Sequence, residues 1–324
     1  MDERMRWRPV VARAEGGTIR AYDPTGERAG QTAGEPAGEL RPVAEFEVPA
    51  GEEVGSCAVA ADFARAWFTT ADGAACLAAD GTVRWRAVFG PGRTHGHGPR
   101  PECALSADGA ALWVYRPDAT AGRGPDRWTV LDAATGAPLA DAELSTVGAG
   151  AVLLPHPTDG SVLLNVGEGQ DGSTVYRGVL RGGALELTEY PWDDRCLIDL
   201  SPDGERFLTV DHGQADLTVH DHPDGAARFT VTVEDFGPEA VAHEAVIEWS
   251  GGHLDADTLA VVLYGEDEDG AEWLRTHRVD ARTGRVLGPF DAHLKDCDDL
   301  SPLGDGSWLT GHGSAHPVRR WPTV

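Results

Sequence analysis

Three acidic residues, Asp199, Glu248 and Asp299, stand at equivalent places in three successive repeats of the chain, each shortly before a turn. The matching places in the three preceding repeats hold Ala58, Ala104 and Leu153. If the repeats surround one axis, the carboxylates converge into a strongly negative patch that favours a cation. Oxygen ligands suit Ca²⁺ or Mg²⁺. Without a cation, crowding raises the pKa of at least one carboxyl group and suits it to acid or base catalysis.

A structural explanation of the same carboxylates stays open. Acids that line a water-filled channel are solvated, or they accept hydrogen bonds from neighbouring backbone N–H groups. A measurement can distinguish the two explanations, because only the metal hypothesis requires the thermal stability of the protein to depend on divalent metal.

Further polar residues fall in the loops that connect repeats and gather at one rim. The candidates for ligand binding are His95, His97, Asp194, Arg195, His243, Glu244 and His293. Long polar loops on a rigid scaffold often carry function. His95 and His97 alternate in the sequence THGHG and, if extended, would offer two imidazoles to a transition metal. The glycines around them also fit a flexible loop.

The elements that position these residues are repeated strands. Apolar runs begin near Cys57, Cys103, Ala151, Cys196, Ala245 and Cys297. Within each repeat, Val, Leu, Thr, Phe and Trp alternate with polar residues, and Asp-Gly or Thr-Gly steps supply tight turns. Residues 103–146 contain four such strands. Four strands per repeat are typical of a β-propeller blade, and the first strand of each blade lines the channel.

The chain length fits seven four-stranded blades best, with six as the alternative. The last repeat lacks an outer strand, so strands from both termini must close the ring and hide the sheet edges. We expect one domain over residues 1–324, with a flexible Gly-, Glu- and Pro-rich loop over residues 27–39. The strand tryptophans are expected to pack between blades; they are Trp67, Trp85, Trp113, Trp128, Trp249, Trp273 and Trp308.

Five short motifs carry resemblances to two kinds of propeller repeat. With SADG at 106–109, SPDG at 201–204 and TIRAYDPTG at 18–26, the chain resembles the WD40-like propeller superfamily. DGTVRWR at 80–86 and LDAATG at 131–136 resemble quinoprotein-type repeats, while the Gly-His and Trp-Asp pairs of true WD40 blades are missing. The resemblance concerns architecture, and it implies scaffolding, ligand binding or occasional catalysis on one rim.

Composition excludes several classes of function. The formal charge of −26 opposes binding to nucleic acid and to anionic membranes. The five cysteines are odd in number and without a CxxC pair, and the first residues lack an apolar secretion signal, so a cytoplasmic location is expected. The sequence has no GxSxG elbow and no phosphate-binding loop.

Two functions remain after these exclusions. The first is a cytoplasmic binding module that presents its rim and acidic channel to a protein partner or a cationic ligand. The second is a metal-assisted hydrolase, lyase or isomerase that uses the channel carboxylates with rim histidines. No cofactor is certain, and Ca²⁺ or Mg²⁺ is the candidate.

Overall fold

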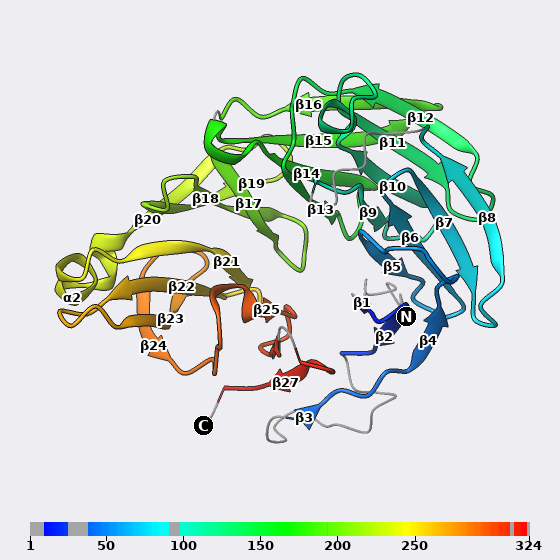
Figure 1. The fold of residues 1–324 in the computed structure, drawn as a ribbon. Coiled ribbons are helices and arrows are strands. Elements are labelled where there is room, and N and C mark those ends of the chain that lie inside the picture. The colour runs from blue at the N-terminus through cyan, green and yellow to red at the C-terminus, as the bar shows by residue number, and fades with distance from the viewer. Residues whose placement is uncertain (1–9, 25–37, 91–97, 193, 312–313, 323–324) are drawn as a thin grey trace, which may run out of the picture. The chain divides into compact units, whose positions relative to one another are not determined.

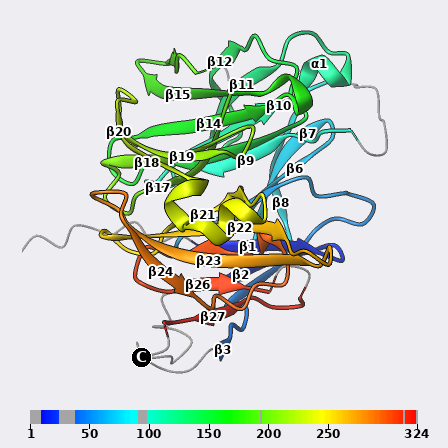
Figure 2. The same cartoon turned by 90° about the vertical axis from the view of Figure 1, so that its left-hand side faces the viewer.

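The computed structural model describes residues 10–24, 38–90, 98–192, 194–311 and 314–322, which form strands almost throughout (Figures 1 and 2). The described residues contain two short α-helices, α1 (Asp118–Ala121) and α2 (Pro238–Ala242). Three 3₁₀ turns are also present, η1 (Gly169–Asp171), η2 (Val233–Phe236) and η3 (Cys297–Asp299). None of the described helices has the length and apolar character needed to cross a membrane. The histidine pair predicted at 95 and 97 lies outside the described residues.

The chain divides into two compact units, the first made of residues 1–28 and 42–193 and the second of residues 29–41 and 194–324. The first unit holds four antiparallel sheets. Blade 1 has β1 (Val11–Glu15), β2 (Thr18–Tyr22) and β4 (Ala44–Glu47), and blade 2 has β5 (Cys57–Val59), β6 (Arg65–Thr70), β7 (Gly73–Ala78) and β8 (Val83–Val88). Blade 3 has β9 (Glu102–Leu105), β10 (Ala111–Arg116), β11 (Arg127–Asp132) and β12 (Pro138–Glu143), and blade 4 has β13 (Gly150–Pro155), β14 (Ser161–Gly167), β15 (Ser173–Arg181) and β16 (Ala184–Glu189).

The second unit holds three sheets of four strands. Blade 5 has β17 (Arg195–Leu200), β18 (Arg206–Asp211), β19 (Asp216–Asp221) and β20 (Ala227–Thr232). Blade 6 has β21 (Val246–His253), β22 (Thr258–Glu266), β23 (Glu272–Asp280) and β24 (Val286–Phe290). Blade 7 has β25 (Ser301–Pro302), β26 (Trp308–Thr310), β27 (Val318–Arg320) and β3 (Gly38–Glu39).

Seven successive sheets of this kind make the fold a seven-bladed β-propeller, which confirms the predicted class and removes the six-bladed alternative. Blade 7 is completed by β3, whose Glu39 pairs with Val318 of β27. The prediction that strands from both termini combine is therefore confirmed. Residues 38–39, the end of the predicted flexible loop, form that strand, and the remaining loop residues, 27–37, lie outside the described ranges.

The predicted tight turns follow from one side-chain motif. In the SPDG sequence, the Asp203 carboxylate accepts hydrogen bonds from Ser201 Oγ at 2.6 Å and from the backbone N–H of Glu205 at 2.9 Å. Gly204 then adopts a φ of 76°, in the left-handed region that glycine enters without a steric penalty. The same hydrogen bonds recur in the SADG sequence of blade 3. This turn chemistry explains why the first hairpins of these two blades share a sequence.

Large aromatic side chains fill the space between neighbouring blades, as predicted. The indole N–H groups of Trp67 and Trp85, in blade 2, both donate to the carbonyl oxygen of Ala133, in blade 3, at 2.9 and 3.0 Å. Trp113, Trp128 and Trp308 are also buried. Trp249 is different, because 45% of its surface is exposed, although the indole, from blade 6, contacts Asp211 and His212 of blade 5.

Candidate functional site

Asp199 lies on β17, the first strand of blade 5, as predicted. Its Oδ2 atom accepts hydrogen bonds from the backbone N–H of His253 at 2.6 Å and from His253 Nδ1 at 2.8 Å. His253 ends β21 of blade 6 and is only 2% exposed. The Asp199 carboxylate therefore ties the first strands of two neighbouring blades together.

Asp299 lies in the 3₁₀ turn η3 rather than on a strand, so its predicted strand position is wrong. The first strand of blade 7, β25, begins only at Ser301, after this turn. The Asp299 side chain is buried, and its two carboxylate oxygens accept hydrogen bonds from the backbone N–H groups of Gly311 and Lys295. A carboxylate with these contacts organises the surrounding loops.

Glu248 lies on β21 and is half-buried. Its carboxylate accepts a hydrogen bond from Gln214 Nε2 at 3.3 Å. Burial raises the pKa of Glu248, and the negative charge of Asp298 raises it further. The described residues of the second unit contain no group of three carboxylate, imidazole or thiol side chains close enough to share a metal ion. Asp199, Glu248 and Asp299 are thus not gathered into one ligand set, and a metal bound by them stays a prediction.

A bulge in β21 places Glu248 and the residue after it. Ile247 pairs with Leu263 and Gly251 pairs with Val261, so residues 248–250 stand opposite a single residue of β22. A bulge of this size redirects side chains away from the regular alternation of a strand. Trp249 is directed outward and is exposed as a result.

The turn between β18 and β19 supports the exposed indole. Trp249 Nε1 donates to the carbonyl oxygen of Asp211 at 3.2 Å, and the indole stacks on the imidazole of His212 at a centroid distance of 5.4 Å. Gln214 in the same turn has a φ of 61°, which is unusual for a residue other than glycine. Its carbonyl oxygen accepts the backbone N–H of Ile247 at 2.8 Å, so the turn is joined to the start of the bulge.

Asp194, a predicted rim residue, completes this region. Its carbonyl oxygen accepts the backbone N–H of His212 at 2.9 Å, and its carboxylate lies 3.6 Å from His212 Nδ1. We name the set formed by Asp194, His212, Gln214, Glu248, Trp249 and Asp298 the Trp249 cluster. It combines one exposed aromatic ring with three acidic side chains, and all of its members belong to the second unit. The sequence pointed to two of them, Asp194 and Glu248, as ligand-binding residues.

Arg195 has an internal role instead. Its guanidinium donates to Thr209 Oγ1 at 2.7 Å and to the Asp216 carboxylate at 2.6 Å. Thr209 Oγ1 also shares a hydrogen bond of 2.9 Å with Nε2 of the buried His220. Burial lowers the pKa of His220 to about 4. The chain of contacts from Arg195 to His220 therefore holds a neutral imidazole inside blade 5.

The remaining predicted rim residues have other partners. His243 Nδ1 is 2.9 Å from the carbonyl oxygen of Glu266, and its ring meets Trp273 edge-on. Glu244 follows in a left-handed conformation with a φ of 48°. His293 is exposed and pairs with Asp291 at 3.0 Å.

Two features of the first unit were not found by sequence reasoning. One is Glu102 on β9, where burial raises the carboxyl pKa to about 7 against the opposing effect of a hydrogen bond from Ser56. An acidic residue at this place breaks the apolar pattern of the strand, which was the available signal. Burial also raises the pKa of the neighbouring Cys57 thiol to about 12, so this thiol is not a ready nucleophile at neutral pH.

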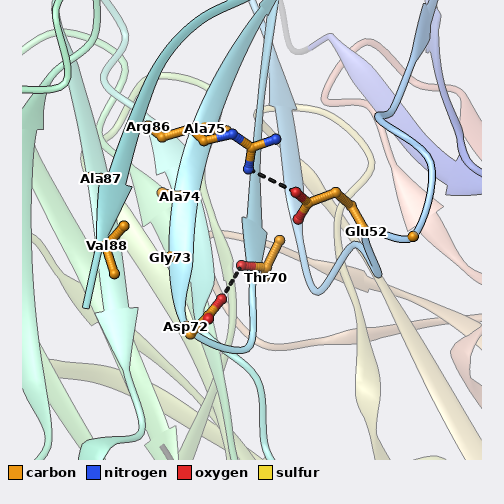
Figure 3. A pocket seen from close by; sticks show the side chains of 10 residues that line it. Glu52, Thr70, Asp72, Gly73, Ala74, Ala75, Arg86, Ala87 and Val88 are labelled. Carbon is orange, nitrogen blue, oxygen red and sulfur yellow. Dashed lines mark hydrogen bonds and ion pairs between the residues drawn. The ribbon is translucent and has the colours of Figure 1, made fainter. Parts of the chain in front are cut away.

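The other feature is a pocket of about 320 Å³ in blade 2 (Figure 3). It is lined by Gly51, Glu52, Thr70, Asp72, Gly73, Ala74, Ala75, Arg86, Ala87 and Val88. Arg86 Nη1 lies 2.8 Å from the Glu52 carboxylate, and Thr70 Oγ1 donates to the Asp72 carboxylate at 3.1 Å. Glu52 and Arg86 are far apart in the sequence, so no local sequence motif indicates the pocket.

No protein-family model matches the sequence, and no curated protein is similar to it in sequence. Several solved structures are similar in fold. Dihydro-heme d1 dehydrogenase NirN in complex with DHE is 14% identical with a TM-score of 0.54, and the match covers 94% of this chain but only 60% of that chain. BBS1N in complex with ARL6DN is 12% identical with a TM-score of 0.51, and the match covers 98% of this chain and 93% of that chain.

BamB from Moraxella catarrhalis is likewise similar, at 12% identity and a TM-score of 0.50, with 97% of this chain and 92% of that chain covered. Identities this low show a shared fold and nothing about activity. The predicted β-propeller architecture of this chain is therefore confirmed.

Proposed function

We propose that this protein is a binding module whose Trp249 cluster receives a cationic side chain, arginine or lysine, from a protein partner. The observation that carries the proposal is the exposed indole of Trp249, held outward by a strand bulge that also carries Glu248. Tryptophan is enriched among the residues that dominate binding energy at protein interfaces. An exposed tryptophan with fixed backbone and ring contacts suits that role, because little conformational freedom is lost on binding.

The charges around the indole favour a cation. The carboxylate of Asp194 lies 3.6 Å from His212, and that of Glu248 accepts a hydrogen bond from Gln214. Asp298 acts electrostatically on Glu248, and the whole chain carries a formal charge of −26. A guanidinium or ammonium group placed over an indole face gains about 0.5 to 2 kcal/mol, with more from neighbouring carboxylates. The overall negative field also speeds the encounter with a basic partner.

Two further observations support a role of this kind in the cytoplasm. All five cysteines are free thiols, which fits a reducing compartment. The similar structure of BBS1N is of a complex with another protein, ARL6DN, although that is a property of BBS1N. The enzymatic alternative is not favoured, because Asp199, Glu248 and Asp299, which it requires in one site, have separate hydrogen-bond partners.

The test uses peptides of defined charge. The ¹⁵N-labelled protein is titrated with Gly-Arg-Gly-Arg-Gly and with the matched peptide Gly-Glu-Gly-Glu-Gly, and the indole N–H signal of Trp249 is assigned through its loss in Trp249→Phe. We expect the arginine peptide alone to shift this signal. Trp249→Ala should weaken binding by about tenfold or more.

Leu287→Ala is the matched control, since Leu287 is 47% exposed on β24 of the same unit and lies outside the cluster. It should bind the arginine peptide as the parent protein does. Equal binding by the parent and Trp249→Ala, or equal shifts with both peptides, would refute the proposal.

A further inference from the structure

The pocket in blade 2 is a hollow made by small side chains. The strands that line it carry the small residues Gly73, Ala74 and Ala75 on β7 and Ala87 on β8, and of these Gly73 and Ala75 share the sheet face of Arg86 and Val88. A Cβ atom on Gly73 would lie 2.6 Å from the carbonyl oxygen of Ala87, so β7 and β8 approach closely here. Larger residues at these places would fill the space. The volume of about 320 Å³ is at the small end of ligand pockets and suits a molecule of a few residues at most.

The pocket has an ion pair, Arg86 with Glu52, at one end and the carboxylate of Asp72 at the other. In Figure 3 the Arg86 and Glu52 side chains face each other at one end, and Thr70 and Asp72 lie at the other. Arg86 is 42% exposed, and one of its five N–H donors meets Glu52. The other donors remain for a second carboxylate. Asp72 receives one hydroxyl hydrogen bond and retains acceptor capacity for an ammonium group.

We propose that this pocket binds a short zwitterionic peptide of small residues. The α-carboxylate pairs with Arg86, the α-ammonium group pairs with Asp72, and small side chains lie on Ala75 beside Val88. Charge-assisted hydrogen bonds at both ends give orientation and select against blocked termini. The site lies wholly in the first unit and does not depend on the Trp249 cluster.

The test is titration of the ¹⁵N-labelled full chain with Ala-Ala. We expect shifts confined to the pocket residues and millimolar affinity. Arg86→Gln and Asp72→Asn should each weaken binding by about tenfold or more. Acetylation of the peptide N-terminus or amidation of its C-terminus should do the same.

Two controls make the outcome decisive. Arg84→Gln removes the same charge from an exposed residue of the same strand that does not line the pocket, and it should leave the affinity within about twofold. Trp249→Ala should also have no effect, which separates this site from the proposed function. Absence of Ala-Ala shifts up to about 20 mM, equal losses in Arg84→Gln and Arg86→Gln, or equal binding of the blocked peptides would each overturn the proposal.

Discussion

The indole of Trp249 lies on the imidazole of His212, with ring centroids 5.4 Å apart and ring planes 30° apart. The indole N–H is bonded to the carbonyl oxygen of Asp211, so the ring is fixed while 45% of its surface stays exposed. Fixed position and exposure together distinguish this tryptophan from the buried tryptophans between blades. Its removal should therefore affect binding far more than folding.

Trp249→Ala should lower the free energy of unfolding by less than about 1 kcal/mol, because the indole is half outside the core. Trp67→Ala is the contrasting change, since Trp67 is fully buried and donates to Ala133. It should cost about 3 to 5 kcal/mol. Urea denaturation followed by circular dichroism measures both, and similar losses in the two variants would show that Trp249 is a packing residue.

Asp199→Ala should destabilise the protein by about 1 to 3 kcal/mol, because it leaves two hydrogen-bonding groups of the buried His253 without their acceptor. Asp291→Ala is a matched control. Asp291 makes the same two kinds of contact, with the backbone N–H and Nδ1 of His293, but on the surface. Its loss should cost less than about 0.5 kcal/mol in the same denaturation experiment. A loss of unfolding free energy in Asp291→Ala as large as that in Asp199→Ala would contradict the claim that burial of His253 makes the Asp199 contacts important.

His220 should make the protein less stable in mild acid. Burial lowers the folded-state pKa to about 4, whereas the unfolded chain binds the proton near the ordinary value of 6.5. Between these values the unfolded state holds more protons, so stability rises from pH 4 to pH 6.5, by about 1 to 3 kcal/mol from this group. Unfolding free energies of the parent and His220→Gln across this range measure the effect. The slope should be smaller in the variant.

The contribution of Glu102 to stability should change with pH in the opposite direction to that of His220. Its folded-state pKa is raised from 4.5 to about 7, so the folded protein holds more protons than the unfolded chain between these values. Its contribution to stability is complete below pH 4.5 and is lost as the pH rises through 7, by about 1 to 3 kcal/mol. Glu102→Gln should therefore be more stable than the parent at pH 8 and closer to it at pH 4.5. No gain at pH 8 would mean that the carboxylate is well solvated.

Divalent metal should leave the melting temperature unchanged, because Asp199 and Asp299 already receive backbone N–H hydrogen bonds. Thermal melts in Ca²⁺, in Mg²⁺ and in EDTA test this expectation. A rise in melting temperature with either metal that disappears in the triple variant Asp199→Asn, Glu248→Gln, Asp299→Asn would favour the metal hypothesis instead.

The strand pattern and the turns were predictable because they depend on local chemistry. The alternation of apolar residues defines the strands, and the Ser201 to Gly204 turn is set by hydrogen bonds within a few residues. The seven-bladed count also followed from the repeat length. Pairing of β3 with β27 was inferred only in outline, because nothing in a two-residue strand identifies its partner.

The site was less predictable, for reasons visible in three residues. Trp249 sits in an apolar strand pattern and is exposed because of a three-residue bulge, whose one local signal is the Gly251-Gly252 pair with positive φ. Asp299 fits the repeat spacing, yet the local chain forms a 3₁₀ turn. Asp199 was placed on the correct strand, but its partner His253 is fixed by how two sheets meet. Contacts between distant elements decide all three outcomes.

The pairing of β3 with β27 has a consequence for biogenesis. The chain segment containing Glu39 is synthesised long before its partner Val318. Blade 7 therefore cannot be completed until β27 has been made, whereas blades 2 to 6 have all their strands before that point. Nascent chains stalled before residue 318 should display an unpaired strand edge that recruits chaperones or neighbouring polypeptides.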